Sequence, residues 1–241
     1  MPTVVRGGRP RLLARARADI VECVACPRLR DHCHRVALEK KRAHREDTYW
    51  GRPVPGFGDP AARILVLGLA PAAHGANRTG RAFTGDAPGG SSDFLMAALH
   101  RARWASLPTS RSADDGLSLR EVYVSIAVRC APPDNAPMPE EVARCLPHLA
   151  AEVRALPQLQ TVVALGRIAF DAWLQLLAQE GQRVRPKSAF AHGSVWTMPD
   201  GRTLIGSYHP SRQNTNTGRL TPAMFDDVFR LAARSLRTPR L

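Results

Sequence analysis

Residues 63–86 read RILVLGLAPAAHGANRTGRAFTGD, an apolar run followed at once by a loop rich in glycine and alanine. The run Ile64-Leu65-Val66-Leu67 is short and aliphatic, which is typical of a strand buried on both faces. The loop that follows ends on Phe83 and Asp86. This stretch predicts an inner strand of a parallel sheet, with a polar loop at its carboxyl end.

Strand-like and helical segments alternate along the rest of the chain. We expect further strands at 121–128 and 161–166, and two more around the turn Pro199-Asp200-Gly201. We expect helices over 11–23 and 28–42, separated by Pro27, and over 91–104, 139–156, 167–179 and 221–237. Residues 46–60 are rich in Gly and Pro and predict a loop. This alternation specifies an α/β fold in which helices cover both faces of a mostly parallel sheet.

The bulk composition limits the class of protein. The chain has 241 residues, of which 44% are hydrophobic, and we expect a single domain over 1–241 in which residues 1–45 form an N-terminal helical segment. The 34 Lys and Arg residues outnumber the 21 Asp and Glu residues, and the net charge of +13 favours a polyanionic partner such as nucleic acid. No apolar run is long enough to span a membrane or to direct secretion, so we expect a cytoplasmic protein.

Four of the five cysteines form two distant pairs. Cys23 and Cys26 have the C-x2-C spacing, whereas Cys130 and Cys145 lie far along the chain. A metal centre with these ligands would tie the N-terminal helices to the main domain, and four thiolates suit either zinc or an iron-sulfur cluster. The spacing slightly favours zinc, and buried thiols without a metal are a third reading. Cys33 could form a rival site with Cys23 and Cys26, but we prefer an ordinary helix position for it.

Polar residues follow three of the predicted strands, where ligands bind in sheets of this kind. The pair Gly75-x4-Gly80 has the glycine interval of a phosphate-binding loop, but Arg81-Ala82 replace the required Lys and Ser/Thr. The loop instead suits a flat ring stacked on Phe83 and a water held by Asp86. Taken alone, a purely structural loop with Phe83 in the core would be the better reading.

The other two strand ends strengthen the ligand reading. The segment SYHPSRQNTNTGR carries His209 and, in Arg212 and Arg219, side chains suited to phosphate oxygens. The segment RCAPPDNAPMPE places Asn135 after a second strand. Three polar strand ends in one sheet predict a shared binding cavity.

The sequence resembles the family 5, or type b, uracil-DNA glycosylases. The resemblance rests on GLAPAAHGANRTGRAFTGD, AVRCAPPDNAPMPEE and HPSRQNTNTGRLT, together with the order of the four cysteines, and covers nearly the whole chain. It implies a three-layer α/β/α sandwich carrying a 4Fe-4S cluster. The ligands that it implies are Cys23, Cys26, Cys130 and Cys145, which replaces the preference for zinc drawn from spacing.

The resemblance also implies roles for the residues at the strand ends. Asp86 and Asn135 match residues implicated in catalysis, and His209 matches the histidine of the HPS motif. Phe83 matches an aromatic residue that stacks on the base. We expect substrate contacts from Phe83, Ala70, His74, Asn77, Gly80 and Arg81, and DNA contacts from Ser211, Arg212, Gln213, Asn214 and Arg219.

Four positions depart from related glycosylases. Ala72 and Ala73 stand where relatives place a water-activating Asp or Asn, a gap that type b members share. Ile126 stands where members strict for uracil carry an Asn, so discrimination between bases should weaken. Gln213 occupies a position where some relatives insert an apolar wedge into the base stack.

The expected reaction is hydrolysis of the N-glycosidic bond of a flipped base, leaving an abasic site. The expected substrates are uracil and other deaminated bases such as hypoxanthine in DNA, and we expect a monomeric, nucleoid-associated bacterial enzyme. The three motifs contain no lysine, so we do not expect strand cleavage through a Schiff base. The alternatives are a non-catalytic DNA-binding module with a four-cysteine zinc site, and a relative that binds or crosslinks uracil-DNA without turnover.

Overall fold

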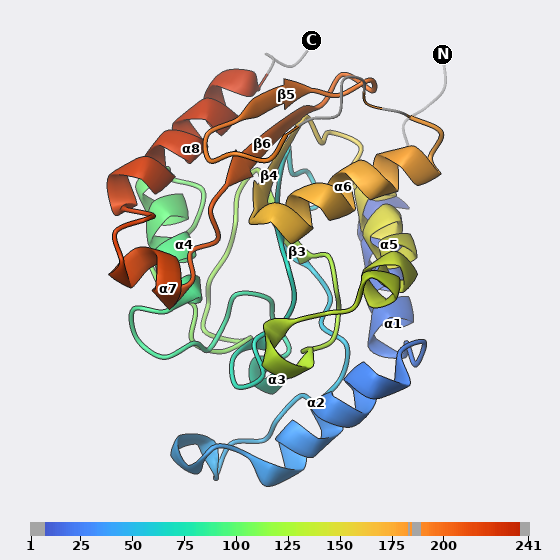
Figure 1. Ribbon diagram of the computed structural model, residues 1–241, viewed down its shortest axis with the longest axis vertical. Helices are drawn as coiled ribbons and strands as arrows, with labels where there is room; N and C mark the ends of the chain where they lie inside the picture. Colours follow the sequence, from blue (N-terminus) through green and yellow to red (C-terminus); the bar gives the residue numbers. More distant parts are fainter. Residues whose placement is uncertain (1–7, 183, 185–188, 237–241) are drawn as a thin grey trace.

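The computed structural model describes residues 8–182, 184 and 189–236, and within them the strands form one six-stranded sheet (Figure 1). The strand order is β1-β3-β2-β4-β6-β5. The inner strands β3, β2, β4 and β6 are parallel, and β1 and β5 pair antiparallel at the two edges. Their bounds are Phe57–Gly58 (β1), Ile64–Gly68 (β2), Val122–Ile126 (β3), Thr161–Leu165 (β4), Val195–Thr197 (β5) and Thr203–Ser207 (β6). The prediction of a mostly parallel sheet is confirmed.

The predicted helices are present, with ends shifted by a few residues. Their bounds are Gly8–Val21 (α1), Pro27–Glu39 (α2), Ser91–Arg101 (α4), Pro139–Arg154 (α5), Arg167–Gln179 (α6) and Pro222–Ser235 (α8). Proline occupies the first turn of α2, α5 and α8, where its missing N–H costs nothing. Short helices α3 (Ala76–Thr79) and α7 (Arg212–Asn216) and strand β1 lie in segments that the sequence predicted as loops. Arg237, the predicted end of the last helix, lies outside the described residues, as do both ends of the expected 1–241 domain.

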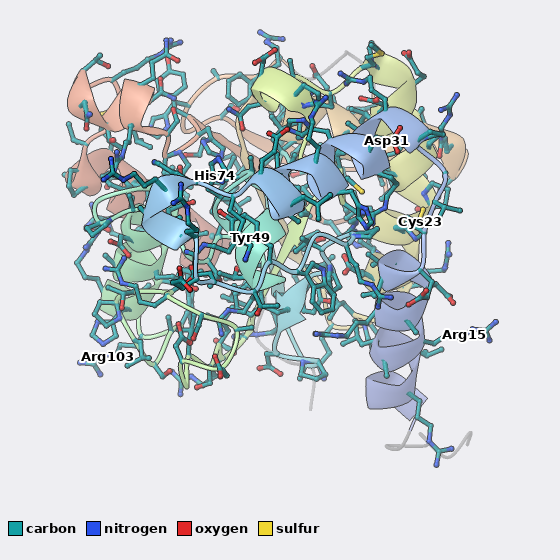
Figure 2. All side chains as sticks on the ribbon, turned by 90° about the horizontal axis from the view of Figure 1, so that it is seen from below. Arg15, Cys23, Asp31, Tyr49, His74 and Arg103 are labelled. Atoms are coloured by element: carbon teal, nitrogen blue, oxygen red, sulfur yellow. The ribbon has the colours of Figure 1, made fainter. Side chains whose placement is uncertain are left out.

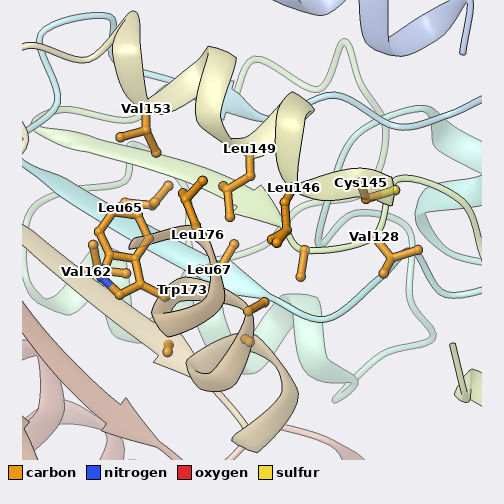
Figure 3. Close-up of a cluster of buried hydrophobic side chains, with 14 of the residues drawn as sticks. Leu65, Leu67, Val128, Cys145, Leu146, Leu149, Val153, Val162, Trp173 and Leu176 are labelled. Atoms are coloured by element: carbon orange, nitrogen blue, oxygen red, sulfur yellow. The ribbon is translucent and has the colours of Figure 1, made fainter. Parts of the chain in front are cut away.

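One face of the sheet is covered by α5 and α6. Leu65, Leu67 and Val162 point to this face and are completely buried with Leu149 of α5 and Trp173 of α6 (Figure 3). Helix α1 packs against the outer side of α5. Cys145 and Val128 lie at the end of the same cluster. Three cysteines of the predicted metal centre, Cys26, Cys130 and Cys145, are part of this core.

The other face is covered by α4 and α8, on the opposite side of the sheet in Figure 1. Ile64 and Val66 alternate with Leu65 and Leu67 and so point to this second face, where they pack with Leu95 of α4 and Phe225 of α8. All positions of β2 are buried because both of its faces are covered. The result is three layers, helices on sheet on helices, as expected.

A buried ion pair joins β3 to α5. Arg129 donates to Glu152 at 2.8 Å and to Ser125 at 3.0 Å, and Glu152 also accepts from the Gly56 backbone at 2.7 Å. Both charged side chains are 1% exposed. Removing one partner of such a pair costs about 3–5 kcal/mol because the other charge stays buried. The pair fixes the chain where it leaves β3, just before the segment that carries Asn135.

The parallel strands all end at the same edge of the sheet, the end marked by α3 and α7 in Figure 1. The chain turns to one side of β2 to form β3 and then crosses to the other side to form β4. Such a reversal opens a crevice at the carboxyl ends of the strands. None of the described helices has both the length and the apolar character needed to cross a bilayer.

Candidate active site

A cavity of about 580 Å³ opens at the carboxyl ends of the sheet. Segments after β2, β3 and β6 line it, and they bring together the three predicted catalytic residues Asp86, Asn135 and His209. The remaining lining residues include the predicted Ala70, Phe83, Ser211, Arg212 and Gln213, and Leu69, Ala72, Ala76, Thr84, Ala87, Gly90, Ser91 and Asp134, which were not predicted. The expectation that separate strand ends share one site is therefore met in the geometry.

Phe83 forms an aromatic wall of the cavity. Its ring lies against the backbone of Gly68, where a Cβ atom would come within 2.6–2.7 Å of the ring. The backbone of Phe83 is left-handed, with φ of +48°, a conformation that costs a bulky residue of the order of 1–2 kcal/mol. The ring stacks against His209 with 6.0 Å between ring centres. Phe83 is therefore held in place from two sides.

His209 carries a neutral imidazole near pH 7. Burial lowers its pKa to about 4, well below that of a free histidine. Its backbone carbonyl accepts a hydrogen bond from the Asn214 side chain at 2.8 Å, which ties the histidine to α7. A neutral imidazole can donate one N–H hydrogen bond to a group in the cavity without first losing or gaining a proton.

Asp86 lies beside the N-terminus of α4. One carboxylate oxygen accepts from the Ser92 backbone N–H at 3.0 Å, and the positive end of the helix dipole stabilises the negative charge. Gly75 and Gly90 leave the room that the side chain needs, since a Cβ atom at either position would clash with Asp86. Two glycines on different sides of the loop thus confine this carboxylate.

Asn135 follows β3 and is exposed on the cavity rim. Asp134 and Asn135 both have left-handed backbones, with φ of +54° and +56°. Asp and Asn adopt this conformation more readily than most residue types, so the chain can make a sharp turn here. Asp134 adds a second carboxylate to the cavity, and the only sequence signal for it is its place directly before Asn135.

Four predicted substrate residues point elsewhere, and for them the sequence prediction of cavity contact is not met. They are His74, Asn77, Gly80 and Arg81. His74 bonds through Nδ1 to the Tyr49 hydroxyl at 3.0 Å, beside the segment that follows α2 (Figure 2). Asn77 is completely buried and donates weakly to the backbone of Cys33 and Ala73. Gly80 ends α3 with φ of +75° and packs against Trp50.

Arg81 is part of the core and not of the cavity. Its guanidinium makes a two-pronged contact of 2.8 Å with Asp115 and also bonds to Ser110 and Thr84. A further bond reaches the backbone of Ala113 at 3.0 Å. Each of the three guanidinium nitrogens of Arg81 thus bonds within the protein. Most of these partners could not be predicted, because residues 110–115 are distant in sequence.

Only some of the predicted DNA-binding residues line the cavity. Ser211, Arg212 and Gln213 line the cavity rim, and Arg212 also donates to the Pro88 carbonyl at 3.0 Å. Asn214 supports His209, as described above. Arg219 is exposed and lies over the Tyr208 ring, with 4.6 Å from its guanidinium carbon to the ring centre.

The four predicted metal ligands surround a second, small cavity between the α1–α2 junction, the end of β3 and α5. Cys23, Cys26, Cys130 and Cys145 all line it, together with Arg30, Arg129 and Arg144. Among the described residues, no group of three His, Cys, Asp or Glu side chains has the geometry that holds a single metal ion. Within the same part of the chain, Arg129 Nε is buried and has no hydrogen-bond partner.

Burial governs the state of these thiols. It raises the pKa of Cys26, and it raises that of Cys145 to about 11. Binding a metal here would therefore release protons. Cys33 does not line the small cavity. Its sulfur accepts from the Ala131 backbone N–H at 3.2 Å, and its thiol also forms a hydrogen bond with the Cys130 thiol.

Comparison with known proteins identifies relatives of this chain. The family described as "Uracil DNA glycosylase superfamily" matches residues 55–233. A type-5 uracil-DNA glycosylase of Mycobacterium leprae is 50% identical over 218 residues, covering 90% of this chain and 93% of that protein. A type-5 enzyme of Thermus thermophilus is 52% identical, covering 89% and 94%, and one of Pyrobaculum aerophilum is 45% identical, covering 89% of each chain.

Proposed function

This chain belongs to the uracil-DNA glycosylase superfamily, and within it to the type-5 enzymes, and we propose that it removes uracil and other deaminated bases from DNA by hydrolysis. The observation that carries the proposal is the meeting of Asp86, Asn135, His209 and Phe83 in one cavity at the strand ends. DNA is the partner in this proposal, and the enzyme works as a monomer in the bacterial cytoplasm, at the nucleoid.

The first step is extrusion of the base from the double helix. The net charge of +13 attracts the phosphate backbone, and Arg212 at the rim can contact a phosphate beside the flipped nucleotide. Flipping costs a few kcal/mol and costs least at a mismatch, so a uracil opposite guanine opens more easily than a paired base. Gln213, also on the rim, is placed to contact the gap that the base leaves.

The second step is departure of the base. Phe83 stacks on the ring, and the bond between sugar and base breaks with negative charge growing on the base. His209, neutral because its pKa is about 4, donates an N–H hydrogen bond to that charge. A preorganised donor of this kind is worth about 3–4 kcal/mol in the transition state.

The third step is attack of water on the sugar. Asp86 and Asn135 hold the water, and the Asp86 carboxylate also stabilises the positive charge that develops on the sugar. The oxygen of water bonds to C1′ as the bond from C1′ to the base nitrogen breaks. The water gives up one proton to the Asp86 carboxylate, which passes it to solvent, the departing base takes up a proton, and the product is an abasic site. None of the described residues lining the cavity is a lysine, which supports hydrolysis without strand cleavage.

The proposed base range includes hypoxanthine. The cavity volume lies within the usual range for small-molecule sites and admits a purine as well as a pyrimidine. Ile126 is 1% exposed and packed in the core at the end of β3. Position 126 therefore offers no amide to the edge of uracil, and loss of such a contact weakens rejection of other bases.

The test is release of free base from oligonucleotides that contain one uracil or one hypoxanthine. We expect the wild-type protein to release both bases, and Asp86→Ala/Asn135→Ala to release neither while still binding the DNA. An Arg101→Gln variant is a matched control, because Arg101 pairs with Asp226 on the far side of α4. Excision by the double variant at the wild-type rate would contradict the assignment of the two residues.

We also propose that the four-cysteine cavity holds a 4Fe-4S cluster. Four thiolates would leave the bound cluster negatively charged, and Arg30, Arg129 and Arg144 line the same cavity. The unpartnered Nε–H of Arg129 suits a sulfide acceptor, which a zinc ion lacks. A single zinc also requires ligands that converge on one point, and the described side chains do not. When bound, the cluster would link the α1–α2 segment to the sheet.

Anaerobic purification followed by iron and sulfide analysis tests this proposal. We expect about four of each per chain, the stoichiometry of the cluster type proposed. Alanine at Cys23, Cys26, Cys130 or Cys145 should remove the iron. Cys33→Ala should keep it, since Cys33 does not line the small cavity. Zinc in place of iron, or loss of iron in Cys33→Ala, would contradict the ligand assignment.

A further inference from the structure

Arg78, on the short helix α3, joins three segments of the chain. Its Nη1 donates to Asp47 at 2.7 Å, its Nε to the His74 carbonyl at 3.0 Å and its Nη2 to the Gly85 carbonyl at 2.7 Å. The side chain is 15% exposed. No part of the proposed chemistry uses it, and it does not line the cavity.

Two of these contacts lie next to the residues that surround Asp86. Gly85 directly precedes Asp86, and His74 directly precedes Gly75, whose backbone lies against the Asp86 carboxylate. A Cβ atom at Gly85 would come within 2.5 Å of Thr79 and 2.8 Å of Arg78 Nη2, so the guanidinium packs directly on this backbone. Arg78 therefore bonds to the backbone on both sides of the Asp86 carboxylate, at His74 and at Gly85.

Asp47 fixes the guanidinium from outside the loop. It lies after α2 and pairs with Arg78, and it also lies 3.2 Å from the ring of His44. Lysine could not replace Arg78, because one ammonium group cannot bond in the three directions that a planar guanidinium reaches. Arg81, three residues on, shows the contrast, since its bonds run to residues 84 and 110–115 and none reaches the backbone next to Asp86.

We propose that Arg78 is a positioning residue for the glycosylase reaction. Anchored by Asp47, it holds the backbone at His74 and Gly85 and so sets where the Asp86 carboxylate points. This inference rests on the proposed role of Asp86. A shift of about 1 Å in a catalytic carboxylate can lower the rate of the reaction about 10²-fold, although substrate binding is unaffected.

The experiment measures single-turnover excision of uracil with enzyme in excess. It compares wild type, Arg78→Gln, Arg78→Lys, Asp86→Asn and the double variant Arg78→Gln/Asp86→Asn. We expect Arg78→Gln to lower the rate constant about 10- to 100-fold with DNA affinity unchanged, and Arg78→Lys to recover only part of it. In the Asp86→Asn background, Arg78→Gln should cause no further loss, because its effect passes through Asp86. Asp47→Asn, which keeps Arg78, should cause a smaller loss than Arg78→Gln.

The outcomes separate this inference from the function on which it rests. A wild-type rate in Arg78→Gln, or a second full loss when it is added to Asp86→Asn, would show that Arg78 does not act through Asp86. A wild-type rate in Asp86→Asn would instead overturn the catalytic role proposed for Asp86. Thermal unfolding of each variant, with Arg101→Gln as the control for a lost arginine–aspartate pair, identifies a loss of rate that comes from unfolding.

Discussion

The loop between β2 and α4 has two parts. Both contain polar residues, but their side chains have different roles. Residues 74–81 carry His74, Asn77 and Arg81, whose side chains bond to the rest of the protein. Residues 83–86 carry Phe83 and Asp86, which line the cavity. The first part is the scaffold that holds the second. A polar residue at a strand end is therefore not by itself a ligand contact, because partners from distant segments can use up its hydrogen bonds.

Among the proposed variants, we expect the largest loss of activity from a change in residues 83–86. Asp86→Asn keeps the shape of the side chain and removes its charge, so we expect excision to slow by about 10² to 10⁴-fold. The free energy of unfolding should change little, because the amide oxygen can still accept from the Ser92 N–H. Single-turnover rates and chemical denaturation of the same variant check both statements. A stability loss that matches the loss of activity would remove the distinction between the two parts.

The second prediction tests the first part, where the effect should reverse. Arg81→Met removes the cation that pairs with the largely buried Asp115, which keeps its bonds to the backbone of Arg111 and Leu117. We expect a loss of about 3 kcal/mol in unfolding free energy. The rate constant for excision at 20 °C should stay near that of the wild type, because none of the Arg81 bonds reaches the backbone next to Asp86. Denaturant unfolding and base release measure the two effects. A rate loss in a fully folded variant would instead make Arg81 a positioning residue, as proposed for Arg78.

The third prediction concerns pH and His209, which stacks on Phe83. In the unfolded chain a histidine takes up a proton near pH 6.5, whereas in the folded chain the pKa is about 4. Between these values the unfolded state binds more protons, so this contribution to stability is full above pH 6.5 and is lost as the pH falls toward 4. His209→Gln lacks it. Unfolding free energies at pH 7.5 and 4.5 should therefore differ more for the wild type than for the variant.

The smallest effect is expected at His74. His74→Phe removes the hydrogen bond to Tyr49, which is worth about 1 kcal/mol, and leaves the cavity unchanged. We expect a small fall in the unfolding temperature and no change in excision. Differential scanning calorimetry and base release provide the check. A tenfold slower excision would instead support the substrate contact that the sequence predicted for His74.

Most of the fold could be predicted because its signals are local. The short, mostly apolar runs at 64–67, 122–126 and 161–165 are typical of strands buried on both faces. Strand β1 was not predicted, because it has only two residues and lies among glycines and prolines. The buried pair Arg129–Glu152 was not predicted either, because a charged pair inside the core depends on two segments meeting in space.

The candidate site could be predicted only in part. Asp86, Asn135 and His209 each follow a strand end, and parallel strands bring such ends together. The fact that parallel strands end at one edge of the sheet does not tell which residues of a loop face the cavity. That depends on partners such as Tyr49, Asp115 and Asp47, which lie in other segments. The small helix α7, which positions His209 through Asn214, also had no sequence signal strong enough to predict it.

Gly68 shapes the cavity although it has no side chain. The phenyl group of Phe83 rests on a bare α-carbon, so the depth of the pocket is set by main-chain atoms at the end of β2. A single methyl group at position 68 would push the ring outward and make the pocket shallower.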